Sequence, residues 1–209
     1  MTRDRTTTSY AVLGLLAIRP WTTYELAKQV QRSLRWFWPR AERKLYDEPK
    51  RLVADGLATA AREHTGRRGR SVYTITDAGR AALRSWLDEP VAPPTTDFEG
   101  MVKVFFADAG STEQLLESLG RIEEQAKERV EEIAAMAATR PLAFPERAHL
   151  SALTMQLVRE QEEVTQRWAH WAGEQVRQWS DTTDPAEWDA LGVLSEIGRM
   201  SPPGGSLGA

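Results

Sequence analysis

The chain has 209 residues and a formal net charge of −3, which allows one large or two small domains. It contains no cysteine, which excludes a disulfide framework, a thiolate nucleophile and a zinc–thiolate site. No apolar run approaches the roughly 20 residues of a membrane-spanning helix, and residues 1–8 lack the apolar core of a signal peptide. We therefore expect a cytoplasmic protein without a membrane partner.

The charges are unevenly distributed along the chain. Residues 1–90 carry 17 Lys and Arg against 10 Asp and Glu, a net charge of +7, whereas residues 91–209 carry 10 against 20, a net charge of −10. A basic region favours a polyanionic partner, and an acidic region is repelled by phosphates. The distribution predicts that only the N-terminal part binds nucleic acid.

The first ninety residues begin with a polar arm, residues 1–8, followed by an apolar helix over 9–18 that Pro20 ends. Thr22 and Glu25 form a capping box that opens a second helix, which runs to about residue 32. If this helix starts a helix-turn-helix, its N-terminus faces phosphate, so Thr22, Thr23 and Tyr24 are candidate contacts. The aromatic cluster of residues 36–38 predicts a plug in the core.

Residues 35–57 predict a helix with two faces. Leu45, Pro49 and Leu52 recur at i, i+4 and i+7, which predicts an apolar docking stripe. The opposite face carries Arg40, Arg43, Asp47, Lys50, Arg51 and Ala54. Such a helix suits a DNA major groove, although a solvated surface helix has the same pattern. Pro49 removes a helical hydrogen bond and clashes with the carbonyl of Leu45, so we expect a kink or a break there.

A hairpin is predicted directly after this helix. Residues 71–76 are rich in β-branched and aromatic residues, and Gly66 and Gly69 mark the turn that joins them to residues 57–64. The turn carries Arg67, Arg68 and Arg70. A helix followed by a hairpin with a cationic tip is the winged-helix arrangement, in which the tip reaches phosphates or the neighbouring minor groove.

The rest of the chain predicts helices. Thr76 caps one that runs to Leu87, and prolines fill the linker, residues 89–97. Residues 98–107 predict a short helix that is apolar on nearly all sides and therefore buried. A capping box at Ser111 and Gln114 opens a helix that ends at Pro141, with a coiled-coil-type seam at Leu115, Leu119, Ile122, Ala126, Val130, Ile133 and Ala137.

A second long helix is predicted from residues 144–145 to 179, with apolar positions Leu150, Leu153, Leu157, Val164, Trp168 and Trp171. The two long helices predict an antiparallel hairpin with apolar surface left over for a dimer. Asp184 is expected to cap a last helix through Ile197, and the tail, residues 201–209, is disordered by composition.

Residues 10–90 resemble the PadR-type family of winged-helix transcriptional regulators. The matching segments are residues 10–16 (YAVLGLL), 24–26 (YEL), 44–46 (KLY), 50–52 (KRL), 55–57 (DGL) and 73–80 (YTITDAGR). The family usually has an aliphatic residue where this chain has Pro49. The helical remainder resembles the C-terminal dimerisation part of the larger members. In some drug-sensing relatives aromatic residues of these helices line an effector cleft, which makes Trp86 a candidate, although a core role for it is the simpler reading.

The resemblance implies a mainly α fold: an N-terminal winged helix-turn-helix with a two-stranded β wing in residues 1–90, and an all-α dimerisation and effector domain in residues 91–200. It implies a homodimer that binds double-stranded DNA at a palindromic operator, and a repressor that a small aromatic effector releases. The candidate DNA-binding residues are Thr22, Thr23, Tyr24, Arg40, Arg43, Lys44, Tyr46, Asp47, Lys50, Arg67, Arg68 and Arg70.

Two other classes of function fit the sequence less well. An enzyme is disfavoured because His64, His149 and His170 lack metal-ligand spacing, and because neither a phosphate loop nor a nucleophile elbow is present. The carboxylates at 160, 162 and 163 predict a solvated helix face, and no cofactor or metal is expected. A winged helix that binds protein instead of DNA is the alternative, and the arginine-rich wing argues against it.

Overall fold

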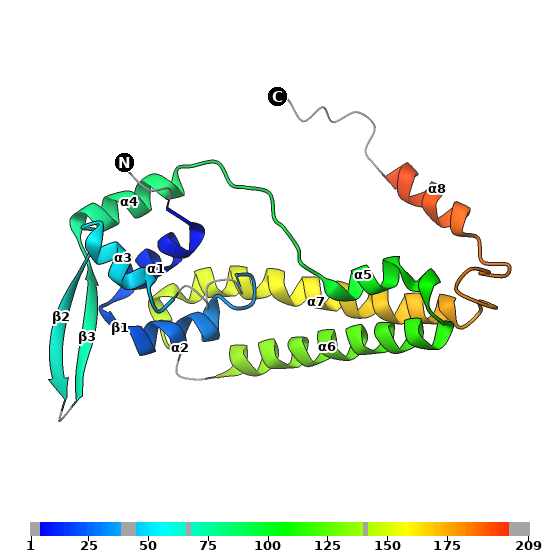
Figure 1. The fold of residues 1–209 in the computed structure, drawn as a ribbon, viewed down its shortest axis with the longest axis horizontal. Helices are drawn as coiled ribbons and strands as arrows, with labels where there is room; N and C mark the ends of the chain where they lie inside the picture. The colour runs from blue at the N-terminus through cyan, green and yellow to red at the C-terminus, as the bar shows by residue number, and fades with distance from the viewer. Residues whose placement is uncertain (1–4, 39–44, 66–67, 140–141, 201–209) are drawn as a thin grey trace. The chain divides into compact units, whose positions relative to one another are not determined.

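The computed structural model describes residues 5–38, 45–65, 68–139 and 142–200 (Figure 1). The chain divides into two compact units, Met1–Pro94 and Thr95–Ala209. The N-terminal unit contains α1 (Thr7–Ile18), β1 (Trp21–Thr22), α2 (Thr23–Ser33), α3 (Glu48–Ala54), β2 (Ala58–Thr65), β3 (Arg68–Ile75) and α4 (Asp77–Leu87).

The sheet of the N-terminal unit is antiparallel, with strand order β1-β3-β2. β2 and β3 form the hairpin, in a register that pairs Ala58 with Ile75 and Thr65 with Arg68 (Figure 1). The short β1 adds Trp21 and Thr22 to the free edge of β3, a strand that the sequence did not predict. This arrangement confirms the predicted winged helix-turn-helix, and β1 ties the start of α2 to the wing.

The core of the N-terminal unit lies between α1, α2, α3 and the sheet. Leu45, Pro49 and Leu52 are all fully buried, so the predicted docking stripe is confirmed. They join apolar residues of the other elements: Val12, Leu13, Leu16, Leu26, Val30, Tyr73 and Ile75. Burial of each large aliphatic side chain contributes roughly 1.5–3 kcal/mol, so this stripe fixes how α3 lies on the unit.

Of the helix predicted over residues 35–57, with a kink or a break at Pro49, the described residues are helical only over Glu48–Ala54. Residues 34–37 and 45–47 form turns, and α3 starts only at Glu48. Pro49 therefore lies in the first turn of α3, where a backbone N–H has no helical acceptor and the fixed φ of proline suits the helix. The proline starts the described helix instead of kinking its interior.

The aromatic cluster after α2 does not form a core plug. Phe37 is exposed, and Trp36 and Trp38 are half-buried. The indole Nε1–H of Trp38 donates to the hydroxyl of Thr8 over 3.3 Å, which holds this turn against α1. The leucines and valines of α1 and α2 already fill the interior, so the cluster packs on the outside.

The C-terminal unit is helical. It contains α5 (Glu99–Phe105), η2 (Ala107–Ala109), α6 (Thr112–Ala138), η3 (Pro145–Arg147), α7 (Ala148–Val176) and α8 (Ala190–Met200). α6 and α7 lie side by side and antiparallel, as predicted (Figure 1). The capping box at the start of α6 is confirmed, because Ser111 and Gln114 exchange backbone-to-side-chain hydrogen bonds of 3.4 and 3.0 Å.

α7 carries two apolar faces, and α6 covers the one with smaller residues. The buried residues of α7 are Val158, Ala169, Gly173 and Val176. Most of the large predicted seam residues are exposed instead: Leu150, Leu153, Leu157, Val164 and Trp171. The seam prediction is therefore correct for most of α6 and wrong for the α7 face that meets it. Small residues allow the two helices to approach closely and leave the leucine stripe uncovered.

The two shorter helices also differ from prediction. None of the residues of α5 is buried, so its expected burial is wrong within this chain. α8 begins at Ala190, and its cap is Asp189, whose Oδ1 accepts the N–H of Gly192 over 2.8 Å. Asp184 instead closes a turn by accepting the N–H of Ala186. Leu191, Leu194 and Ile197 of α8 are exposed.

Candidate nucleic-acid interface and an aromatic cavity

The N-terminus of α2 is built on the predicted capping box. The hydroxyl of Thr22 accepts the N–H of Glu25 and donates to its carboxylate, which also accepts the N–H of Thr22 over 2.8 Å. These hydrogen bonds from Thr22 hold the pKa of Glu25 below its ordinary value, and the positive charges of Arg19 and Arg70 act in the same direction. Thr22 is buried and its polar groups are occupied, so it orients the N-terminal end of α2. Contacts with a phosphate are left to the residues that follow it.

The candidate phosphate contacts meet the wing in one hollow. This hollow has a volume of about 390 Å³ and is lined by Thr22, Thr23, Tyr24, Glu25, Arg70 and Ser71. Pairing of β1 with β3 produces this juxtaposition, because Thr22 lies opposite Val72. Tyr24 is 72% exposed, so its ring and hydroxyl face solvent beside the hollow. Helix-end N–H groups and a guanidinium on one concave surface form a favourable site for an anion.

The wing arginines differ in what the structure describes. Arg70 forms an ion pair of 3.0 Å with Glu63, directly across the hairpin, and both side chains are about half exposed. Arg67 lies outside the described residues, and Arg68 is the first residue of β3. Exposed ion pairs contribute little to stability, so Arg70 can exchange its carboxylate partner for a phosphate at small cost.

The candidate base-reading residues fall into two groups. Arg40, Arg43 and Lys44 lie outside the described residues, so their role stays a prediction. Tyr46 is 61% exposed just before α3, and Asp47 and Lys50 form an exposed ion pair of 3.5 Å. The exposure of Asp47 and Lys50 agrees with the predicted polar face, although the described helix α3 is only seven residues long and begins after Tyr46 and Asp47.

A buried carboxylate anchors α3, and no pattern in the sequence indicates it. Glu48 is 3% exposed, and its Oε1 accepts a hydrogen bond of 2.5 Å from the hydroxyl of Ser9 in α1. Its other oxygen lies 3.5 Å from the guanidinium of Arg51. A negative charge in the first turn of a helix is favoured by the helix dipole. Glu48 therefore fixes the end of α3 that leads toward the predicted base-reading residues.

Trp86, the candidate effector residue, stacks on Tyr10 with ring centroids 4.8 Å apart and planes at 5°. This contact joins α4 to α1 inside the N-terminal unit. Other tryptophans line a cavity of about 560 Å³ in the C-terminal unit. Among the described residues that line this cavity, Trp86 is absent. The role of Trp86 toward an effector stays a prediction.

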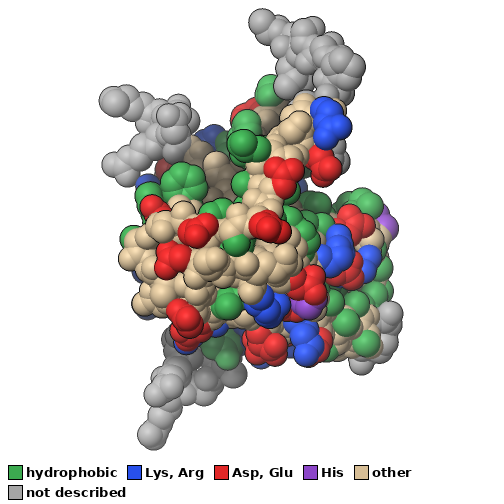
Figure 2. All heavy atoms as spheres, turned by 90° about the vertical axis from the view of Figure 1, so that its right-hand side faces the viewer, with side chains coloured by type: hydrophobic (Ala, Val, Ile, Leu, Met, Phe, Trp, Pro, Cys, Tyr) green, Lys and Arg blue, Asp and Glu red, His purple; other side chains and the backbone are tan. Residues whose placement is uncertain are grey.

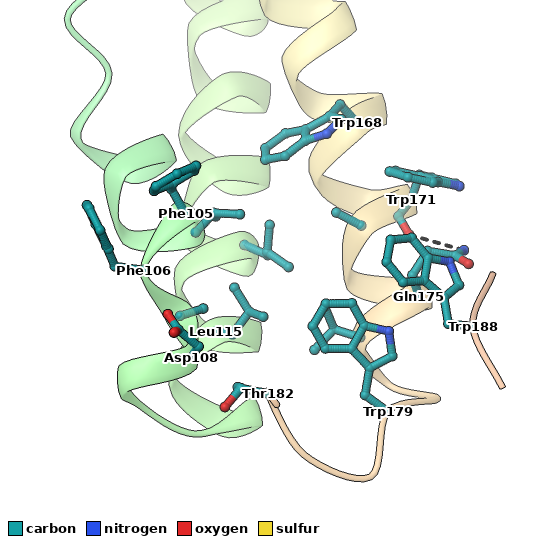
Figure 3. A pocket seen from close by; sticks show the side chains of 15 residues that line it. Phe105, Phe106, Asp108, Leu115, Trp168, Trp171, Gln175, Trp179, Thr182 and Trp188 are labelled. Atoms are coloured by element: carbon teal, nitrogen blue, oxygen red, sulfur yellow. Dashed lines mark hydrogen bonds between the residues drawn. The ribbon is translucent and has the colours of Figure 1, made fainter. Parts of the chain in front are cut away.

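The aromatic cavity lies where α5, the start of α6 and the end of α7 meet (Figure 3). Its walls include Trp168, Trp171, Trp179 and Trp188, together with Phe105. Figure 3 shows Trp168 projecting from α7 toward Phe105 of α5. Trp188 comes from the segment before α8, and its ring lies 5.4 Å from that of Trp179. The sequence identified these tryptophans as apolar but not as members of one site.

Among the described residues, no group of three or more His, Asp or Glu side chains is arranged to hold a metal ion. His170 instead contacts Glu123 over 3.1 Å on the surface of the helical hairpin. Glu162, expected on a solvated face, is mostly buried beside Arg129, and burial raises its pKa. No helix in the described ranges is long and apolar enough to span a membrane.

The chain matches two family models. Residues 12–85 match the Transcriptional regulator PadR-like family, and residues 99–177 match the model described as Virulence activator alpha C-term. The negative transcriptional regulator PadR of Bacillus subtilis (strain 168) is 28% identical over 169 residues, which are 75% of this chain and 91% of that protein. The two models fall on either side of the proline-rich segment between α4 and α5.

Solved structures of the Bacillus subtilis protein have the same fold. Its complex with operator DNA gives a TM-score of 0.71 at 22% identity, covering 82% of this chain and 99% of that one. Its complex with p-coumaric acid gives a TM-score of 0.62 at 23% identity, covering 83% of this chain and 99% of that one.

Proposed function

Because the chain belongs to the PadR-like family of transcriptional regulators, we propose that it acts as a dimeric repressor that binds a palindromic operator and is released by a small aromatic effector. Members of this family are DNA-binding regulators and not enzymes. The observation that carries the proposal for DNA is the hollow in which the N-terminus of α2 and Arg70 of the wing meet. A regulator of this kind works in the cytoplasm, where bacterial DNA lies.

In the proposed complex, the hollow beside α2 holds one backbone phosphate. The first turn of α2 offers N–H groups and the hydroxyl of Thr23, while Tyr24 lies exposed beside them. Arg70 approaches from β3 and neutralises the phosphate. These contacts carry no sequence information and set the register of the protein. Base reading is then assigned to the segment before α3, with Arg40 and Arg43 as its principal donors to guanine.

A dimer is proposed because one helix-turn-helix reads only a half-site, and two-fold dimers read two half-sites about one DNA turn apart. The leucine stripe of α7, defined as Leu150, Leu153, Leu157 and Val164, is exposed in the protomer. Its spacing in sevens, threes and fours is that of a helix-packing seam. An exposed apolar stripe on a long helix indicates a protein–protein contact, and a second copy supplies the matching surface.

The sign of regulation and the effector are proposed from the relative. The Bacillus subtilis protein is named a negative regulator and has been solved with p-coumaric acid as well as with operator DNA. A ligand that binds one dimer geometry better than the other shifts the population away from the operator-bound form. The aromatic cavity is the candidate site in this chain.

The test begins with selection of bound duplexes from random sequence by the full-length protein. Affinity for the selected operator is then measured as a function of salt concentration. A steep linear fall in the logarithm of affinity supports DNA binding, and no binding at low salt would exclude it and favour the protein-interaction alternative. Arg70→Gln should weaken operator and random duplex alike and lower the salt slope by about one.

Arg62 supplies the matched control for Arg70. It precedes Glu63 on β2 and is exposed, so the alternation of side chains along a strand directs it to the opposite face of the hairpin. Arg62→Gln removes the same charge outside the hollow and should leave the salt slope nearly unchanged. Equal losses for both variants would show that general charge, and not the hollow, retains the DNA.

A further inference from the structure

The side chains that line the aromatic cavity include an acidic group and no basic one among the described residues. Among the described residues, no Lys, Arg or His lines it, and Asp108 is its one ionisable side chain. The region around it is acidic, since residues 91–209 carry a net charge of −10. Figure 2 views the molecule from the right-hand side of Figure 1, and acidic side chains are spread over this face. An anion entering the cavity would meet negative charge without a cationic partner.

The walls of the cavity favour the opposite charge. Four indole rings are among its lining side chains, and the face of an indole is the best aromatic partner for a cation. Asp108 on the rim adds a carboxylate, which is exposed and therefore partly screened by solvent. The ring faces and the carboxylate of Asp108 act together. Entry into the cavity is therefore favourable for a positively charged group and unfavourable for a carboxylate.

One donor in the cavity wall has no acceptor. The indole Nε1–H of Trp179 is buried, and no described residue accepts a hydrogen bond from it. Because this nitrogen is shielded from solvent, a ligand in the cavity meets the ring of Trp179 and not its N–H. The other polar side chains are engaged: Gln175 contacts the carbonyl of Trp171 over 3.5 Å, and Thr182 donates to the carbonyl of Gly110 over 3.3 Å.

The segment that carries Trp188 is held in place by its own hydrogen bonds. The carboxylate of Asp181 accepts from the N–H and hydroxyl of Thr183, and these bonds lower the pKa of Asp181. Thr182 links the segment to the turn after η2. These hydrogen bonds hold the segment of Trp188 in place, so the cavity has a defined shape that can accept a flat ring.

From this geometry we infer that the cavity binds an aromatic cation in preference to an aromatic carboxylate. The cation lies over the indole faces near Asp108. The inference deepens the proposed function, on which its regulatory meaning rests. It assigns this chain a ligand of opposite charge to the p-coumaric acid seen with the Bacillus subtilis relative.

Three probes that share one cinnamoyl group separate charge from shape. They are cinnamate, cinnamamide, and the cinnamide of 2-trimethylammonioethylamine, which are anionic, neutral and cationic. Each is titrated calorimetrically into the full-length protein without DNA, so failure of operator binding cannot affect the result. The cationic amide should bind about tenfold more tightly than cinnamate, with cinnamamide between them. Tightest binding of cinnamate, or no heat from any probe at millimolar concentration, would overturn the inference.

Three variants locate the site. Asp108→Asn, at an exposed position where the fold does not depend on the charge, should bring the cationic and neutral amides to within about twofold of each other. Trp179→Phe replaces an indole by a weaker aromatic partner for a cation and should weaken the cationic amide about threefold while changing the affinity for cinnamate little. Trp38→Phe is the control, because Trp38 is a half-buried tryptophan of the other unit. Unchanged binding of the cationic amide in both cavity variants would place the site elsewhere and refute the inference.

Discussion

The exposed leucine stripe of α7 allows a quantitative prediction about assembly. Leu153 and Leu157 are 71% and 55% exposed in the protomer, and these fractions are what a partner can still bury. Full burial of a leucine contributes roughly 2 kcal/mol relative to water, so truncating both to alanine removes roughly 2 kcal/mol per protomer. A two-fold interface contains each residue twice, which gives roughly 4 kcal/mol per dimer.

Since about 1.4 kcal/mol is a factor of ten, the double variant Leu153→Ala, Leu157→Ala should raise the dimer dissociation constant by roughly a thousandfold. Both residues point away from α6 and alanine has the higher helix propensity, so the helices themselves should remain intact. Sedimentation of the full chain from nanomolar to micromolar concentration measures the constant, and circular dichroism checks the helices.

Leu87 provides the control, because it is 67% exposed and belongs to the N-terminal unit. Leu87→Ala should leave the dissociation constant within about threefold of the unmodified protein. A dimer as tight in the double variant as in this control would refute the assignment of the interface to the stripe. An unmodified chain that sediments as a monomer at micromolar concentration would refute the dimer.

Three further predictions concern the interface to DNA and the helical hairpin. Arg43→Ala should relax sequence preference by roughly 1–3 kcal/mol at one base pair, whereas Arg68→Ala should weaken all duplexes alike; equal changes in specificity would contradict this division of roles. Glu48→Ala removes the acceptor of the Ser9 hydroxyl and should destabilise the α1–α3 contact by about 2 kcal/mol, seen as faster hydrogen exchange in α1 and α3 and unchanged exchange in α6. Burial raises the pKa of Glu162, so its contribution to stability is present below the ordinary value of 4.5 and is lost as pH rises through the folded-state pKa. Urea titrations across this range should show that loss, and Glu162→Gln should flatten it.

Elements defined by local chemistry could be predicted from the sequence. The capping boxes at Thr22 and Ser111 need only residues three positions apart, and both are present in the structure. The wing follows from β-branched runs and two glycines. The stripe of Leu45, Pro49 and Leu52 follows from helical spacing alone, although α3 is shorter than expected.

Features that depend on distant residues could not be predicted. Glu48 stands in a charged stretch that suggests a surface, and its burial is determined by Ser9, thirty-nine positions earlier. α7 contains a stripe of large residues and a face of small ones, and periodicity does not tell which of them meets α6. Trp188 packs on Trp179 instead of entering α8, so Asp189 and not Asp184 caps that helix.

The ion pair between Arg70 and Glu63 has a consequence for how the protein searches for its operator. An arginine that already has a carboxylate partner gains less from any passing phosphate than one surrounded only by water and salt ions. Weaker attraction to arbitrary duplex shortens each visit to it, and about 10⁶ to 10⁹ such sites compete in a genome. Glu63 thus shortens every contact of the wing with DNA, and Glu63→Gln should lengthen the residence time on random DNA and on the operator by a similar factor.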